Sequence, residues 1–173
     1  MAKDYTIVID TREGLPYWIK KIITFSDYKV KFNSESKKQW IDYLNANVKK
    51  GYKFGTLNVG DYSIEGYESK LAVERKSLAD LYGTLGKGHK RFKAELERSQ
   101  SFDYFAIVIE GSYSHCKNKS FPGAFYSKMQ GYVITKILWT IHMKYKVPFF
   151  FTNTRAESRT VIKDMFDGYL SIQ

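Results

Sequence analysis

Leu71-Ala-Val-Glu-Arg-Lys76 is predicted to form a β-strand. Successive side chains of a strand point to opposite faces, so Glu74 and Lys76 share one face while Arg75 points to the other. A carboxylate and an ammonium group therefore lie on one surface. On an exposed strand such a pair is usually a solvated ion pair of small energetic value. The alternative is a catalytic arrangement, which needs further polar groups nearby.

Asp61 is a second carboxylate that the chain can bring to this surface. It precedes Glu74 by 13 positions, and a hairpin that turns near Gly66 would bring the two residues together. Two carboxylates that leave room for bound water suit Mg²⁺, and we expect Mn²⁺ to substitute for it. The backbone carbonyl of Arg75 is a further candidate ligand. The sequence therefore predicts a metal site at Asp61 and Glu74.

Such a site has the parts needed for phosphodiester hydrolysis. A bound Mg²⁺ can orient the scissile phosphate, stabilise charge in the transition state and lower the pKa of a bound water. Lys76 would position or activate that water and neutralise charge. The guanidinium of Arg75 could clamp a phosphate or hold a neighbouring carboxylate in place.

Two other carboxylates lie close to the ends of predicted elements. Residues 5–10 form a short apolar run that ends on Asp10, as expected of a buried strand that carries a polar group to the sheet edge. Asp80 follows Ser77 by three positions, which is a capping-box pattern. Asp80 therefore has two interpretations, a catalytic carboxylate or a residue that stabilises the start of a helix.

The remaining pattern interleaves strands and helices, which predicts an α/β sandwich around a mixed sheet. Strands at residues 52–58, 61–65 and 70–76 are expected to form an early meander because turn residues separate them. Further strands are expected at residues 104–110 and 147–152. Helices are expected from Pro16 to about residue 24, from Ser36 towards Gly51, at 77–85, 90–99 and 124–145, and from Thr154, where Glu157 completes a capping box, to the C-terminus.

Length and composition predict one domain over residues 1–173, because no linker or repeat divides the chain. The net charge of +10 favours a polyanionic partner such as nucleic acid or an acidic membrane surface. No apolar run approaches the roughly 18 residues of a membrane span, and the first residues lack the apolar segment of a signal peptide. We therefore expect a soluble, intracellular protein that does not bind membranes.

The cysteine and histidine content argues against other chemistry. Cys116 is the single cysteine, so an internal disulfide is excluded, and histidines at positions 89, 115 and 142 do not have zinc-ligand spacing. His115 and Cys116 are adjacent, and adjacent side chains diverge on regular structure, which argues against a catalytic dyad. A metal ion is therefore expected to have oxygen ligands.

Two segments suggest macromolecular contacts. Lys87, His89, Lys90 and Arg91 gather beside Gly86 and Gly88 before a predicted helix, where they could hold a DNA phosphate or form an ordinary solvated loop. The predicted helix 124–145 is apolar nearly all round. It packs on several sides within one subunit, or part of it forms a homodimer interface.

The combined motifs resemble the XPF-type structure-specific endonucleases, a branch of the PD-(D/E)xK nuclease superfamily. The family signature is matched by Gly60-Asp61, Glu74-Arg75-Lys76 and Asp80, and an upstream element by Asp10-Thr11-Arg12-Glu13. The family's Gly-Arg-x-x-x-Gln stretch is matched only loosely, because Arg91 is kept while Glu95 stands in place of glutamine. The resemblance covers nearly the whole chain.

This resemblance implies a restriction-endonuclease-like fold with a mixed central β-sheet flanked by α-helices. It implies that Asp61 and Glu74 bind the metal, with Asp10 as a possible further ligand, and that Arg75 and Lys76 assist at the phosphate. Asp10, Glu13 and Asp80 would complete the acidic cluster, and Arg12 would join Lys87, His89, Lys90 and Arg91 in binding DNA.

The implied substrate is branched DNA, such as a flap, a fork or a Holliday junction. Many relatives carry helix-hairpin-helix modules after the nuclease domain, and we expect none in a chain that ends at Gln173. Junction targeting would then come from the nuclease domain, from a homodimer acting as a resolvase, or from a further protein partner. Two alternatives remain: a restriction-like or DNA-degrading nuclease without branch specificity, and a non-catalytic DNA-binding scaffold subunit.

Overall fold

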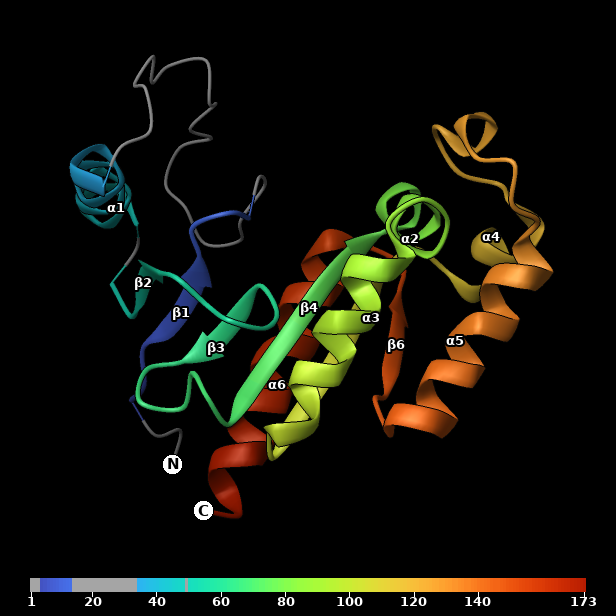
Figure 1. Ribbon diagram of the computed structural model, residues 1–173. Helices are drawn as coiled ribbons and strands as arrows, with labels where there is room; N and C mark the ends of the chain where they lie inside the picture. Colours follow the sequence, from blue (N-terminus) through green and yellow to red (C-terminus); the bar gives the residue numbers. More distant parts are fainter. Residues whose placement is uncertain (1–3, 14–33, 49) are drawn as a thin grey trace.

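A mixed β-sheet forms the centre of the computed structural model, which describes residues 4–13, 34–48 and 50–173 (Figure 1). The six strands are arranged in the order β2-β1-β3-β4-β5-β6. Their bounds are β1 Ile7–Asp10, β2 Tyr52–Gly55, β3 Tyr62–Ile64, β4 Leu71–Ser77, β5 Tyr104–Glu110 and β6 Phe149–Thr152. Helices cover both faces, so the predicted fold class is confirmed.

The predicted meander is wrong at its first step, because β2 and β3 are not neighbours. β1 lies between them, with Ile7 opposite Tyr52 of β2 in a parallel pair and opposite Ile64 of β3 in an antiparallel pair. Every residue of β1 is buried, and a fully buried apolar strand is stabilised by neighbours on both sides. Of the three strands in the predicted meander, β3 and β4 do form a hairpin, with Tyr62 opposite Val73.

Two apolar cores lie on opposite faces of the sheet. One face packs against α1 (Ser34–Asn47) and α6 (Arg155–Ser171), and it includes Ile162 and Phe166. The other packs against α2 (Leu78–Leu85), α3 (His89–Arg98) and α5 (Gly131–Tyr145). Figure 1 shows α3 in front of the sheet and α6 behind it. No helix among the described residues meets the length and apolarity that crossing a membrane requires.

Most predicted helices are present, with ends that differ by a few residues. The capping boxes at Ser77 and Thr154 are confirmed, since the Ser77 side chain accepts from the Asp80 N–H and the Thr154 side chain accepts from the Glu157 N–H. The helix predicted from Pro16 to about residue 24 lies outside the described residues. The segment between the predicted strand 104–110 and the predicted helix 124–145 contains a short helix for which no prediction was made, α4 (Tyr113–Asn118).

The long helix predicted over 124–145 is too long at its start. α5 begins at Gly131, after a single 3₁₀ turn at Ala124–Tyr126 and an extended stretch that ends at Gln130. α4 packs directly on the first turn of α5: a Cβ at Gly131 would lie 2.0 Å from the carbonyl oxygen of Lys117. Tertiary packing, which helical periodicity does not encode, therefore sets this boundary.

Candidate active site

The two faces of β4 carry different chemistry. Ala72 belongs to the core beneath α2, α3 and α5, and the two-residue period places Glu74 and Lys76 on that same face. Leu71 and Val73 belong to the core beneath α6, so Arg75 points to the α6 side. The predicted separation of Glu74 and Lys76 from Arg75 is therefore confirmed.

Backbone pairing between β3 and β4 positions Asp61 beside this site. The Asp61 N–H donates to the carbonyl of Val73 at 2.9 Å, and the Arg75 N–H donates to Asp61 Oδ2 at 2.8 Å. Gly60, which precedes it, has φ +73°, and a Cβ there would lie 3.0 Å from the Val73 carbonyl oxygen. A glycine is therefore required before Asp61, because the turn needs a positive φ and approaches β4 closely.

Asp61 and Glu74 open into a cleft of about 300 Å³ between β4 and α3. Four acidic and four basic side chains line it, together with smaller polar groups and one aromatic ring. The lining residues are Asp10, Arg12, Asn58, Gly60, Asp61, Glu74, Lys76, Thr84, Arg91, Phe92, Glu95 and Arg98.

Burial and neighbouring charges shift the pKa values of Asp61, Glu74 and Lys76 in this cleft. Burial raises the pKa of Asp61 well above its ordinary value, and the neighbouring charge of Glu74 raises it further. Burial likewise raises the pKa of Glu74, although the adjacent Lys76 opposes this effect. Burial alone would lower the pKa of Lys76, but the ion pair with Glu74 raises it above its ordinary value. The ammonium form of Lys76 is therefore favoured, which makes it a hydrogen-bond donor in this state.

The donor set of the cleft fits a hard divalent cation. Two repelling, buried carboxylates would be stabilised by a cation between them, and Asp61 and Glu74 supply oxygen ligands of the kind that Mg²⁺ prefers. Within residues 4–13, 34–48 and 50–173, no group of three or more His, Cys, Asp and Glu side chains is arranged to hold a metal ion. The two-carboxylate metal site at Asp61 and Glu74 therefore stays a prediction.

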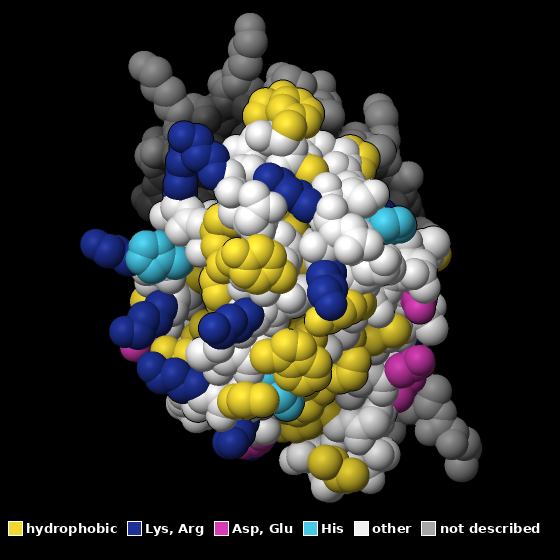
Figure 2. Space-filling model, turned by 90° about the vertical axis from the view of Figure 1, so that its right-hand side faces the viewer, with side chains coloured by type: hydrophobic (Ala, Val, Ile, Leu, Met, Phe, Trp, Pro, Cys, Tyr) yellow, Lys and Arg dark blue, Asp and Glu magenta, His cyan; other side chains and the backbone are white. Residues whose placement is uncertain are grey.

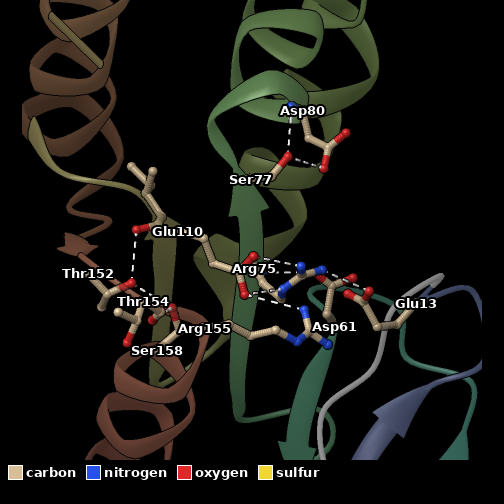
Figure 3. A network of polar contacts seen from close by, with 11 residues as sticks. Glu13, Asp61, Arg75, Ser77, Asp80, Glu110, Thr152, Thr154, Arg155 and Ser158 are labelled. Carbon is tan, nitrogen blue, oxygen red and sulfur yellow. Dashed lines mark hydrogen bonds and ion pairs between the residues drawn. The ribbon is translucent and has the colours of Figure 1, made fainter. Parts of the chain in front are cut away.

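The Arg75 side chain is anchored on the other face of the sheet (Figure 3). Its guanidinium donates to both carboxylate oxygens of Glu110 at 2.8 and 2.7 Å, and to Glu13 Oε1 at 3.0 Å. Arg155, at the start of α6, also reaches Glu110 at 3.4 Å. Of the two interpretations of this guanidinium, the structure supports the one in which it holds neighbouring carboxylates.

Asp10 anchors the loop that follows β1. Its buried carboxylate accepts from the backbone N–H and the side chain of Arg12, and from the Leu57 N–H at 2.7 Å. Arg12 Nη2 also donates to the Leu57 carbonyl at 2.6 Å. Asp10 therefore lines the cleft while it connects β1 to the segment that follows β2.

Asp80 lies apart from Asp61 and Glu13 (Figure 3). It is exposed in the first turn of α2, where its Oδ2 accepts from the Ser77 hydroxyl at 2.6 Å and its N–H donates back to Ser77. Asp80 is not among the described residues that line the cleft. Its contacts are those of the helix-capping interpretation.

The predicted basic loop is only partly in the cleft. Arg91 lines the cleft, whereas Lys87 and Lys90 are exposed and are not among the described residues that line it. His89 Nδ1 is 2.9 Å from the Gly86 carbonyl oxygen. Lys90 is exposed on the first turn of α3. α3 begins at His89 and has no side-chain cap at its N-terminus.

Three charged residues of the site had no predicted role. Glu95 accepts from the Gly60 N–H at 3.1 Å, Arg98 lines the same cleft, and Glu110 holds Arg75. Arg91, Glu95 and Arg98 have the i, i+4, i+7 spacing of one helix face, which was available in the sequence. Glu110 ends β5 as Asp10 ends β1. Its partner, Arg75, lies 35 residues away in the sequence.

Comparison with known proteins agrees with this geometry. The model of the ERCC4 domain matches residues 9–165, which is most of the chain and includes every predicted catalytic residue. The chain belongs to the ERCC4 domain family. The predicted resemblance to XPF-type nucleases is thereby confirmed.

Two solved structures share the fold of this ERCC4 domain. XPF from Aeropyrum pernix matches with a TM-score of 0.58 and 16% identity, covering 97% of this chain and 62% of that one. The same protein in complex with DNA matches with a TM-score of 0.56 and 17% identity, covering 97% of this chain and 65% of that one. This chain therefore spans less than two thirds of each matched XPF chain. No curated protein sequence matched it.

Proposed function

We propose that this ERCC4-family chain is a Mg²⁺-dependent endonuclease that hydrolyses phosphodiester bonds in branched DNA. The observation that carries the proposal is the cleft in which Asp61 and Glu74, both with raised pKa values, lie beside the protonated Lys76. Family membership supports a nuclease, and the matched XPF structure in complex with DNA supports DNA as the substrate.

In this mechanism Asp61, Glu74 and the Arg75 carbonyl would hold the cation. When bound, Mg²⁺ would neutralise charge on the scissile phosphate and favour ionisation of a water molecule. Lys76 donates a hydrogen bond towards the phosphate or the attacking water, and its charge stabilises the transition state. Arg75 acts as a positioning residue, because its backbone N–H fixes Asp61 while its side chain is held by Glu13 and Glu110.

The deciding experiment incubates the purified protein with flap, splayed-arm, four-way and linear duplex DNA, with and without Mg²⁺. We expect metal-dependent cutting of a branched substrate at a higher rate than of linear duplex. Equal rates on all four would instead favour a restriction-like or DNA-degrading nuclease. Binding without metal-dependent cutting would favour a scaffold subunit.

Removal of the metal should change thermal stability in a pH-dependent way. The pKa values of Asp61 and Glu74 are raised in the folded state, so folding favours their protonated forms. Stability from these groups is therefore present below the ordinary carboxyl value of about 4 and is lost as pH rises through the raised pKa values. Mg²⁺ at about 100 times its dissociation constant should restore about 2.7 kcal/mol near neutral pH, or about 5–10 °C in Tm.

Melting curves with Mg²⁺ or EDTA near neutral pH and in mild acid test this expectation. Protons compete with the cation for the same carboxylates, so the Mg²⁺-induced rise in Tm should shrink in acid. Asp61→Asn is the control, because it removes one proposed metal ligand and keeps the other titrating groups that affect the Tm. A Tm that Mg²⁺ raises equally in the wild type and in this variant would contradict the proposed site.

The basic loop should contribute to DNA affinity by binding phosphates. Replacement of Lys87, Lys90 and Arg91 by glutamine should weaken DNA binding and reduce the slope of log affinity against log salt by about 0.9 for each phosphate that is no longer neutralised. Affinity measured over a salt titration checks this expectation. Arg159→Gln with Lys163→Gln on exposed positions of α6 is the control. Unchanged affinity and slope in the triple variant would count against a role of this loop in DNA binding.

We also propose a homodimer that uses the exposed side of α5. Tyr132, Trp139 and Met143 are exposed, and their spacing of seven and four residues places them on one helix face. Figure 2 shows hydrophobic side chains on the side of the molecule that carries α5, with Lys and Arg side chains between them. Two active sites related by a two-fold axis could cut opposing strands of a four-way junction, as in a Holliday-junction resolvase.

Met143→Lys should convert this dimer to a monomer, because it places a charge in an apolar interface while changing an exposed side chain. Light scattering at micromolar concentration, with and without four-way junction DNA, measures the change. The exposed Lys163→Met on α6 is the matched control and should leave the dimer intact. A monomeric wild-type protein under both conditions would exclude the dimer.

A further inference from the structure

A second groove adjoins the candidate active site. Its volume is about 580 Å³, and it shares Arg12, Asn58 and Arg98 with the cleft. From these shared residues it extends along the segment that connects β2 to β3 and towards Ser101 and Phe102, just beyond α3. A ligand in the cleft could therefore continue into this groove.

The groove differs from the cleft in its electrostatics. The cleft contains four carboxylates, whereas none of the described residues that line the groove is acidic. Its two charged side chains are Arg12 and Arg98, both exposed. The charge of the lining is thus wholly positive, which suits an anionic ligand that has no bound metal to neutralise it.

Hydrogen-bond donors in the groove remain available. Arg12 uses its Nε and Nη2 to bind Asp10 and the Leu57 carbonyl, which holds the guanidinium in place and leaves Nη1 without a partner among the described residues. The Arg98 guanidinium makes no hydrogen bond or ion pair within the described part of the chain. One donor group is thus held rigidly, while the other is free to adapt to a phosphate.

An aromatic ring completes the groove. Phe102 is half-buried, so one part of it packs against the core while another part lines the groove. Partly exposed aromatic rings between cations are typical of surfaces that bind single-stranded nucleic acid, because bases stack on the ring while cations follow the phosphates. The volume lies within the about 300–1,000 Å³ of small-molecule sites, which suits a short unpaired segment and not a duplex.

We propose that this groove binds the unpaired strand of a DNA substrate next to the phosphate that is cut. The proposal rests on the proposed nuclease function and adds to it the path of one strand. Phosphates of that strand contact Arg12 and Arg98, and one base stacks on Phe102. Selection of flaps and forks over blunt duplex then follows from the nuclease domain, since blunt duplex has no unpaired strand to fill the groove.

Ser101 allows a test confined to the groove, because it lines the groove and not the cleft. It is exposed, and its hydroxyl donates to the Arg98 carbonyl at 3.0 Å. Ser171 is a matched control, since it is exposed at the end of α6 and its hydroxyl donates to the Gly168 carbonyl at 2.6 Å. Glutamate at either position adds the same charge and removes the same type of hydrogen bond.

Fluorescence anisotropy in EDTA would compare a blunt hairpin duplex with the same duplex carrying a short 3′ or 5′ thymidine tail. Wild-type protein should bind one of the two tailed duplexes more tightly than the blunt duplex. Ser101→Glu should weaken binding of that form about tenfold, because its carboxylate repels the phosphates of the tail, and leave blunt duplex nearly unchanged. Ser101→Lys should strengthen binding of the same tailed duplex. Ser171→Glu should change the affinity for neither the tailed nor the blunt duplex.

A second measurement uses a fluorescent adenine analogue in the tail. Its emission should be quenched by stacking on binding, and Phe102→Leu, which keeps an apolar side chain, should remove the quenching. Equal affinity of wild-type protein for blunt and tailed duplex would overturn the groove proposal, while metal-dependent cutting of the same DNA would leave the nuclease proposal intact. Failure to bind or cut any DNA would overturn both.

Discussion

Asp61→Asn should reduce the rate of metal-dependent DNA cleavage by about 10²–10³-fold, the effect of removing one group that stabilises transition-state charge. It should raise the Tm measured without metal. Both effects have the same cause: burial raises the pKa of Asp61, so its charge destabilises the folded state, and that charge is the one that the metal needs. Asparagine can still accept from the Arg75 N–H, so the turn at Gly60 should persist.

Single-turnover cleavage at saturating Mg²⁺ and melting in EDTA would measure the two effects on one preparation. Glu74→Gln should behave in the same direction, although its ion pair with Lys76 reduces the gain in stability. Asp164→Asn on α6 is the control, because that carboxylate is exposed. Cleavage that survives both Asp61→Asn and Glu74→Gln would mean that the active site lies elsewhere.

Arg75→Met should be the most destabilising of the substitutions considered. The Arg75, Glu13 and Glu110 side chains are 8%, 7% and 15% exposed, so the substitution removes a nearly buried cation that both carboxylates share, while Arg155 still contacts Glu110 at 3.4 Å. Removing one partner of a buried ion pair typically costs about 3–5 kcal/mol. For a chain of this length, that destabilisation corresponds to a fall in Tm of roughly 6–20 °C.

Thermal unfolding of Arg75→Met, Arg75→Lys and the exposed control Arg159→Met would test this expectation. Lysine keeps the charge but cannot reproduce the two-pronged contact with Glu110, so its Tm should lie between those of the wild type and Arg75→Met. Combining Arg75→Met with Glu110→Gln should recover part of the stability, because a carboxylate that has lost the Arg75 guanidinium is then replaced by a neutral amide. A change in Tm as small as that of Arg159→Met would show that the network contributes little to stability.

The sequence predicted the local part of the site well. The alternation along β4 follows from strand geometry, and the hairpin joining Asp61 to Glu74 is a short-range contact. The cap formed by Ser77 and Asp80 is equally local. These features depend on residues that are close in the chain, so patterns of residue type were enough to predict them.

Patterns of residue type could not predict contacts between segments that are far apart in the sequence. The insertion of β1 between β2 and β3 pairs segments more than 40 residues apart, and turn residues near Asn58 and Gly60 are equally compatible with a meander. Arg75 could have contacted a phosphate or a carboxylate, and only the pairing of β4 with β5 places Glu110 beside it. The role of Glu95 required knowing which face of α3 meets the cleft.

The alternation of β4 also links the strand register of the sheet to the proposed activity. A slip of one residue in its pairing would exchange the two faces, placing Arg75 in the cleft and Glu74 with Lys76 beneath α6. Such a molecule would lack Glu74 and Lys76 in the cleft, so the proposed site could not form there. The register of β4 therefore sets both the buried contacts of Arg75 and the position of the proposed metal ligand Glu74.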